Sequence, residues 1–261
     1  MLIDVHADVG AWAFRRLWVE EPDGLLELMA EQGIAAAVVG PVEGITYRNP
    51  QAANERLFER LDAAGRPANL LPAAVINPAF PGWERDLEDA AAAGAATIKL
   101  YPNYHDYSPR DAAARELVAA ATEKGLPVIC CVRVEDERQQ HWLMLVPPVR
   151  AADVAELAAA VDGAHVILAC GNQGEIEAFL GAAPPERTWA EISYLKSPMF
   201  SLEHIVGKFG AERILFGTHA PFLDPGATRI KFERAELTDA DREAIAWKNA
   251  AAIWPALAEL S

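Results

Sequence analysis

Short apolar runs alternate along the chain with longer amphipathic stretches. Eight runs predict buried strands, and they cover residues 2–5, 35–39, 70–76, 96–100, 127–132, 165–169, 188–192 and 213–216. The stretches between them carry apolar residues at helical spacing and predict helices over residues 23–32, 54–64, 83–93, 112–124, 151–161, 175–180 and 202–209. This strand–helix order with short connections predicts parallel strands and right-handed crossovers.

Local turn and capping residues agree with these bounds. Gly125 follows the predicted fourth helix, and Pro127 lies just beyond it. Thr238, with Asp241 three residues later, has the pattern of a capping box that opens a final helix. We expect the segment 133–149 to form an extended loop over one end of the fold.

Eight parallel strands suit a closed barrel, so the expected fold is a single (β/α)8 barrel over residues 1–261. Such barrels typically have about 250 residues. Hydrophobic residues make up 52% of the chain, which is enough for a sizeable core. An open, doubly wound sheet is the competing fold. It would usually have fewer strands, and the chain lacks a Gly-rich phosphate loop of the dinucleotide type.

Charge and composition narrow the possible partners. The net charge is −15, from 38 acidic and 23 basic residues, which argues against nucleic acid and against anionic membrane surfaces. No apolar run approaches the roughly 18 residues of a membrane span, and the first residues do not resemble a signal peptide. The three cysteines, Cys130, Cys131 and Cys170, favour a reducing compartment, so we expect a cytoplasmic protein.

Candidate chemistry gathers where the predicted strands end, which is where barrels place their active sites. His6 and Asp8 alternate along the first strand and therefore share one face. By the same alternation Cys130 should point toward the helices. The polar, titratable or sulfur-containing residues at six strand ends are Asp4, His6 and Asp8; Lys99, Tyr101, Asn103, Tyr104 and His105; Cys131 and Arg133; Cys170 and Asn172; Glu191 and Ser193; and His219.

Several of these segments resemble those of amidohydrolase-related proteins, and the resemblance extends from Ile3 to Trp254. IDVHAD resembles the opening strand of the family, in which a His-x-His pair binds metal. GLPVICC and HVILACGNQG resemble the fifth and sixth strand segments, each of which ends in a histidine. ILFGTHAPF resembles the eighth strand segment, whose aspartate belongs to the metal site. ATIKLYPNY and KNAAAIW match the fourth strand and the final helix.

The resemblance implies a metal site but with altered ligands. His6 keeps the first ligand, and Asp8 stands where the second histidine is expected. Cys131 and Cys170 take the places of the fifth- and sixth-strand histidines, and His219 that of the aspartate. All of these side chains can bind metal, so the predicted site is His6, Asp8, Cys131 and His219 around a divalent cation. Zinc is the expected ion, and a metal-free centre is the alternative.

The residue types at the strand ends suggest further roles around that site. His219 and Cys170 are candidates for moving protons, and Lys99 for orienting a substrate carboxylate. Arg133 is a candidate for gripping an anion in bidentate fashion. The polar and aromatic residues of the loop after the fourth strand are candidate substrate contacts: Tyr101, Asn103, Tyr104 and His105. Each residue also has a structural interpretation, as a buried hydrogen-bonded pair, a packed cysteine, a loop contact or a solvated ion pair.

The sequence therefore favours a metal-dependent hydrolase that acts on a C–N or ester bond of a small, anionic molecule. A decarboxylase of the same family is an alternative, because it would use a similar centre to polarise a carboxylate. A second alternative is a non-catalytic barrel that has lost its metal and binds a ligand or partner. The resemblance also allows a homodimer.

Overall fold

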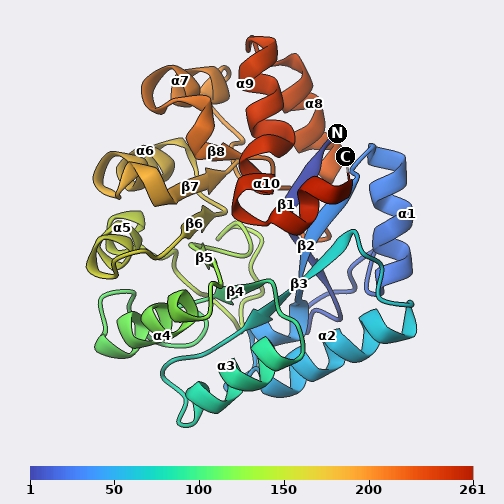
Figure 1. Cartoon of the computed structure of the whole chain (residues 1–261), viewed down its shortest axis with the longest axis vertical. Helices are drawn as coiled ribbons and strands as arrows, with labels where there is room; N and C mark the ends of the chain where they lie inside the picture. The colour runs from blue at the N-terminus through green and yellow to red at the C-terminus, as the bar shows by residue number, and fades with distance from the viewer. Residues whose placement is uncertain (261) are drawn as a thin grey trace.

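The computed structural model describes residues 1–260, and their fold is a (β/α)8 barrel, as predicted (Figure 1). Eight parallel strands follow one another in the order β1 to β8 around the barrel. Each overlaps its predicted run; the one large difference is that β1 extends four residues further, to Val9. The strands are Ile3–Val9, Ala36–Pro41, Leu70–Val75, Thr97–Leu100, Val128–Cys131, Val166–Ala169, Thr188–Glu191 and Ile214–Leu215.

The barrel closes between β1 and the segment that follows β8. The backbone N–H of Val5 donates to Phe216 O at 3.0 Å, and that of Asp8 donates to Ala220 O at 2.8 Å. The Asp4 carboxylate accepts from the backbone N–H of Thr218 at 2.9 Å and also from its hydroxyl. Burial raises the pKa of Asp4 to about 7. The residues at the end of β1 are therefore held beside those that follow β8.

Ten helices surround the described strands (Figure 1). The seven predicted helices are present as α1 to α7, namely Pro22–Gln32, Gln51–Ala63, Trp83–Ala92, Ala112–Glu123, Ala151–Ala160, Gln173–Ala182 and Ser201–Phe209. α8, Pro225–Arg234, was not predicted, because its buried residues are only Pro225, Thr228 and Phe232 and they form no clear apolar stripe. A final helical stretch comprises α9, Asp239–Glu243, a π-helical turn, Ala244–Lys248, and α10, Asn249–Ile253.

The capping box predicted at Thr238 and Asp241 is confirmed in part. Thr238 caps α9, since its hydroxyl accepts from the backbone N–H of Asp241 at 3.1 Å. The Asp241 carboxylate returns to the Thr238 hydroxyl and not to the backbone N–H, so the predicted box is only half formed. A complete capping box lies instead at α6, between Asn172 and Glu175. Asn172, a candidate at the sixth strand end, is thus a helix cap.

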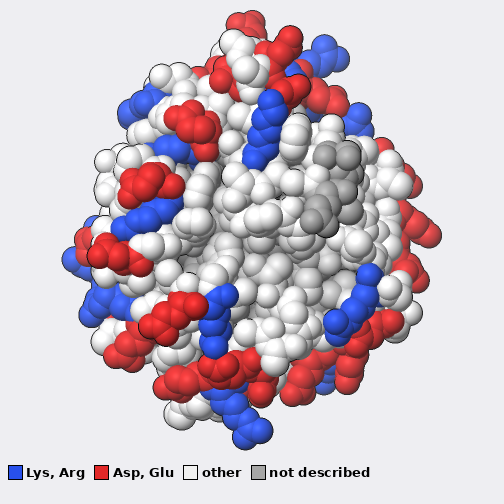
Figure 2. Space-filling model, in the orientation of Figure 1, with Lys and Arg blue, Asp and Glu red and all other residues white. Residues whose placement is uncertain are grey.

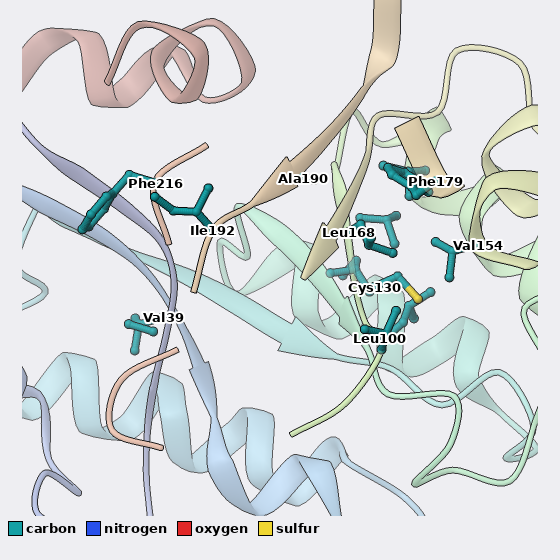
Figure 3. Close-up of a cluster of buried hydrophobic side chains, with 14 of the residues drawn as sticks. Val39, Leu100, Cys130, Val154, Leu168, Phe179, Ala190, Ile192 and Phe216 are labelled. Carbon is teal, nitrogen blue, oxygen red and sulfur yellow. The ribbon is translucent and has the colours of Figure 1, made fainter. Parts of the chain in front are cut away.

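The strands separate two apolar layers. Side chains that point outward pack under the helices, as Figure 3 shows for Cys130 beside Leu168 and Val154. Cys131, the next residue, belongs to the cluster inside the barrel. The alternation predicted for the two cysteines is therefore confirmed. All three cysteines are free and buried.

The C-terminal residues close the end of the barrel at which the strands begin. Trp254 and Leu257 belong to the inner cluster, and the Trp254 indole donates to Ala96 O, just before β4, at 3.1 Å. Figure 1 shows α10 in front of the strands at this end, and Figure 2 shows charged side chains around the rim and an uncharged centre. The strand ends that carry the candidate chemistry lie at the opposite end. No helix in the described part of the chain is both long and apolar enough to cross a membrane.

Candidate metal centre

The predicted ligands come together inside the barrel. β1 supplies His6 and Asp8, β5 supplies Cys131, and Cys170 and His219 follow β6 and β8. All five side chains are completely buried. Four segments that are far apart in the sequence thus bring five buried side chains together, as the strand-end argument predicted.

Hydrogen bonding fixes the tautomer of His219. Its Nε2 lies 2.9 Å from Val134 O, and because a carbonyl can only accept, Nε2 carries the hydrogen. Burial lowers the pKa of His219 well below its usual value, with the nearby His6 adding to the effect, so the ring is neutral. Nδ1 is therefore bare. It lies 3.7 Å from Asp8 Oδ2, and neither atom has a hydrogen-bond partner.

A hydrogen bond also fixes the tautomer of His6. Its Nδ1 lies 3.5 Å from Glu191 Oε1 and donates to it, which leaves Nε2 without a hydrogen. Burial, with a contribution from the Lys99 charge, lowers the pKa of His6 well below its usual value. The bare Nε2 lies 3.8 Å from Asp8 Oδ2 and 3.7 Å from Cys131 Sγ. The lone pairs of His6 Nε2 and Asp8 Oδ2 therefore face each other with no hydrogen between them, while the Cys131 thiol can donate to His6 Nε2.

A divalent cation fits this donor set. Tetrahedral ligands at the usual metal–ligand distances of about 2.0–2.3 Å lie roughly 3.3–3.8 Å apart. Asp8 Oδ2 lies 3.8 Å from His6 Nε2 and 3.7 Å from His219 Nδ1, and His6 Nε2 lies 3.7 Å from Cys131 Sγ, so these three contacts need only small inward movements. Among the described residues, the group of possible ligands whose donor atoms all lie within 4.8 Å of one another is His6, Cys170 and His219. Cys170, which was predicted only to move protons, is therefore a second possible sulfur ligand, whereas Asp8 and Cys131 do not belong to this mutually close group.

Lys99 holds one oxygen of Asp8 and leaves the other free. Its buried ammonium donates to Asp8 Oδ1 at 2.7 Å and to Ala7 O at 2.8 Å. Burial raises the pKa of Asp8 to about 6, and Lys99 opposes that shift. Gly40 on β2 makes room for the pair, since a Cβ there would lie 2.7 Å from Asp8 Oδ1. Gly40 lies just past the predicted strand 35–39 but inside β2, and a glycine at this strand end is the signal that sequence reasoning missed.

Glu191 and Ser193 support the centre from β7. Glu191 accepts from the backbone N–H of Cys170 at 2.5 Å and from the Ser193 hydroxyl at 2.8 Å. Its other oxygen accepts from the backbone N–H of Ser193 at 2.6 Å. A carboxylate behind a histidine fixes the tautomer and raises the basicity of a metal-binding ring.

The backbone is unusual at two of the converging residues. Cys170 and His219 have φ values of 58° and 55°, in the left-handed region that non-glycine residues seldom adopt. Such conformations persist where the surrounding structure enforces them, and they are concentrated at functional sites.

The remaining predicted residues have varied roles. Arg133 makes a two-pronged contact with Glu175 and also donates to Cys170 O at 2.8 Å, so an anion could reach it only by displacing Glu175. Asn103 donates to Val132 O and Pro147 O and anchors the loop after β5.

The three predicted ring-bearing residues of the loop after β4 differ from one another. His105 Nε2 bonds to Gly44 O at 3.0 Å, while Tyr104 packs near Trp12. Burial raises the pKa of the Tyr101 phenol, whose hydroxyl has no partner. Asn103 Oδ1 and His105 Nδ1 are also without partners, but Tyr101 belongs to the cluster inside the barrel, so its free hydroxyl lies there.

Aromatic side chains and the loop after β5 cover the centre. Phe222 stacks on His219 with ring centroids 4.9 Å apart, and Trp12 meets Phe222 edge-on at 5.1 Å. Val134 O, from the predicted extended loop, bonds to His219 from the same side. The indole Nε1 of Trp12 is buried without a partner. Because the metal-centre side chains are fully buried, a substrate must displace part of this cover.

Comparison with known proteins identifies the family of the chain. A family model described as Amidohydrolase matches residues 19–256. The chain belongs to the amidohydrolase family. The resemblance found in the sequence is thereby confirmed. A search of curated proteins finds no match.

Solved structures of similar fold include three that are named as decarboxylases. A dihydroxybenzoic acid decarboxylase from Polaromonas sp., with bound manganese and the inhibitor 2-nitroresorcinol, is 16% identical with a TM-score of 0.75, covering 97% of this chain and 96% of that one. A 2,6-dihydroxybenzoate decarboxylase from Rhizobium is 17% identical with a TM-score of 0.72, covering 98% and 99%. A 5-carboxyvanillate decarboxylase from Sphingomonas paucimobilis is 13% identical with a TM-score of 0.72, covering 97% and 98%. These similarities establish the fold.

Proposed function

We propose that this protein is a metal-dependent decarboxylase of a small organic acid. The observation that carries the proposal is the pair of facing, unpartnered acceptors, Asp8 Oδ2 and His219 Nδ1, in a fully buried centre. Two lone pairs 3.7 Å apart require a cation or a proton between them. The barrels of similar fold that are named as decarboxylases of aromatic acids support the choice of reaction.

Charge supports a divalent ion in particular. Asp8, Glu191 and a Cys131 thiolate would carry three negative charges, against the Lys99 ammonium and the two charges of the ion. Burial raises the pKa of the free Cys131 thiol well above its usual value, and a bound metal would be needed to remove its proton. A bound cation would supply a Lewis acid that polarises a substrate oxygen. The sulfur ligand favours zinc over manganese.

The chain's own residues then have separate roles. Lys99 uses two of its three N–H groups on Asp8 and Ala7, and the third is free to hold a substrate carboxylate. Loss of CO₂ breaks a C–C bond and leaves an electron pair on carbon, which must take up a proton. Burial raises the pKa of Cys170 well above its usual value, so its thiol retains a proton that it can deliver. The proton would be replaced from solvent after CO₂ leaves.

Hydrolysis is the second candidate, favoured by the family description. A hydrolase would need a base to activate water. The described carboxylates of the centre are those of Asp4, Asp8 and Glu191. All of their oxygens already accept hydrogen bonds, with the exception of Asp8 Oδ2, which is assigned to the metal. Decarboxylation needs no such base, and for this reason we favour it.

The experiment compares two adjacent cysteines. Wild type, Cys131→Ala and Cys130→Ala are purified without chelators, loaded with zinc or manganese, and analysed for bound metal and for CO₂ release from hydroxybenzoates. We expect one ion per chain in wild type and in Cys130→Ala, and loss of metal and activity in Cys131→Ala. Ester or amide cleavage without CO₂ would favour hydrolysis. A wild type that binds neither metal would refute the proposal and favour a non-catalytic barrel.

A further inference from the structure

A cavity of about 470 Å³ lies outside the metal centre, between the loop that follows β7 and helices α7 and α8. Three cations line it: Lys196 from the loop, and Lys231 and Arg234 from α8. None of the three has an ion pair or a side-chain hydrogen bond to any described residue. In a chain whose net charge is −15, this cavity is a local concentration of unpaired positive charge.

The one described carboxylate that lines the cavity forms no ion pair with these three cations. Glu203 is the acidic residue of the lining, and its Oε1 accepts from the backbone N–H of Glu236 at 3.0 Å. Lys196 lies over the Tyr194 ring, 4.0 Å from its centroid, so its charge is held in place by an aromatic face. The cavity therefore keeps a positive excess and has a fixed cation at its edge.

Lys231 is the inner cation of the cavity. It is half-buried, whereas Lys196 and Arg234 are exposed. Burial lowers the pKa of Lys231 to about 8, the neighbouring Lys196 lowers it further, and Glu191 of β7 opposes the shift. Burial removes water from the Lys231 ammonium, and no protein group replaces that water. An anion that reaches Lys231 would therefore stabilise its charged form.

Apolar side chains form the rest of the lining. Met199 is 81% exposed and Phe200 60% exposed, and Pro198 and Leu202 lie beside them in the same cavity. An inorganic anion would leave these surfaces in water, whereas a ligand with an apolar body would cover them. The lining thus combines a cationic side with an apolar side.

We propose that this cavity binds a small organic anion with an apolar body, such as an aryl carboxylate, at a site separate from the metal centre. The anionic group pairs with Lys231 and Arg234, and the apolar body covers Met199 and Phe200. The site does not depend on the proposed decarboxylase activity.

The test uses 4-fluorobenzoate as the probe and follows its ¹⁹F signal during titration. The neutral 4-fluorobenzyl alcohol has the same ring, and inorganic phosphate is an anion without one. We expect 4-fluorobenzoate to bind, the alcohol to bind at least about tenfold more weakly, and phosphate to compete poorly, because one charge-assisted hydrogen bond is worth about a tenfold change or more in affinity. Equal binding of the alcohol, or equal binding of phosphate, would overturn the proposal.

Variants on one helix locate the site. Lys231→Met and Arg234→Met should each weaken binding of 4-fluorobenzoate about tenfold. Arg229→Met is the matched control, since Arg229 lies on α8 outside the cavity and pairs with Glu233 at 2.7 Å. Arg234 is exposed, so its variant should fold even if Lys231→Met does not.

A variant of the centre separates this proposal from the proposed function. His219→Ala should keep the affinity for 4-fluorobenzoate while losing metal, and Lys231→Met should keep its metal. If 4-fluorobenzoate binding were instead lost in His219→Ala and kept in both Lys231→Met and Arg234→Met, the probe would bind in the metal centre. That result would refute the proposed site.

Discussion

Asp8 Oδ2 and His219 Nδ1 face each other across 3.7 Å, each without a hydrogen-bond partner and each completely buried. The arrangement follows from two other contacts. Lys99 occupies the other oxygen of Asp8, and Val134 O takes the hydrogen of the His219 ring. Both contacts turn a lone pair toward the same point, next to His6 Nε2. Buried polar atoms without partners are costly, so this geometry is best explained by an ion that belongs between them.

Replacing His219 should therefore abolish metal binding, whereas replacing a matched histidine, His105, should not. His219→Ala removes a proposed ligand, and we expect zinc affinity to fall by at least about 100-fold. His105 is also buried, also bonds a backbone carbonyl through Nε2, and also has an unpartnered Nδ1, but no carboxylate of residues 1–260 forms an ion pair with that atom. His105→Ala should keep zinc. Calorimetric titration of both metal-free proteins decides the matter, and equal zinc affinity in the two variants would contradict the assignment.

Removing Lys99 should destabilise the metal-free protein. Lys99→Met leaves Asp8 as a buried charge without its partner, which should reduce the free energy of unfolding by about 3–5 kcal/mol. The exposed pair of Lys208 with Glu177, 2.6 Å apart, is the control, and Lys208→Met should change stability by less than about 1 kcal/mol. Urea denaturation at pH 7 measures both.

Zinc should restore part of the stability that Lys99→Met loses, because the ion replaces the positive charge of the ammonium beside Asp8. In this variant the ion also binds without repulsion from the Lys99 ammonium. The same urea curves, repeated with saturating zinc, should show a larger gain in stability for Lys99→Met than for wild type. A smaller gain would mean that Lys99 orients Asp8 for the metal more than it repels the metal.

Gly40 should tolerate no side chain. Its added Cβ would lie 2.7 Å from Asp8 Oδ1 and 2.9 Å from Lys99 Cδ, both fixed in the buried ion pair. We expect Gly40→Ala to lower the free energy of unfolding by about 1–3 kcal/mol and to weaken zinc binding, since Asp8 must move. Gly207→Ala in α7 meets open space and should instead stabilise the protein by up to about 1 kcal/mol. Thermal unfolding compares the two; an unchanged or higher midpoint for Gly40→Ala would contradict the expected crowding.

The eight strands could be predicted because each is a distinct apolar run, and alternation within a strand placed His6 with Asp8 and separated Cys130 from Cys131. What could not be predicted depends on contacts between distant loops. Val134 O reaches His219 across 85 residues, and no local pattern marks a backbone carbonyl as a partner.

The pairing of Arg133 with Glu175 shows the same limit. Glu175 lies in the first turn of α6, so its partner is fixed by how the loop after β5 folds back and not by any spacing in the sequence. Helix α8 escaped prediction because it buries few apolar side chains. The strand pattern therefore predicted which candidate ligands come together, but not the groups that orient and cover them.

His105 should make the protein less stable in mild acid. Burial lowers its pKa in the folded protein to about 4, against 6.5 for an unperturbed histidine. Between these values the unfolded chain binds a proton that the folded protein refuses, so stability falls as the pH drops from 6.5 toward 4, by up to about 3 kcal/mol from this residue. His105→Gln, whose amide can still donate to Gly44 O, should lose correspondingly less stability between pH 7 and pH 4.5. Denaturation curves of metal-free wild type and variant at the two pH values measure this difference, and parallel losses in both proteins would show that His105 is not its source.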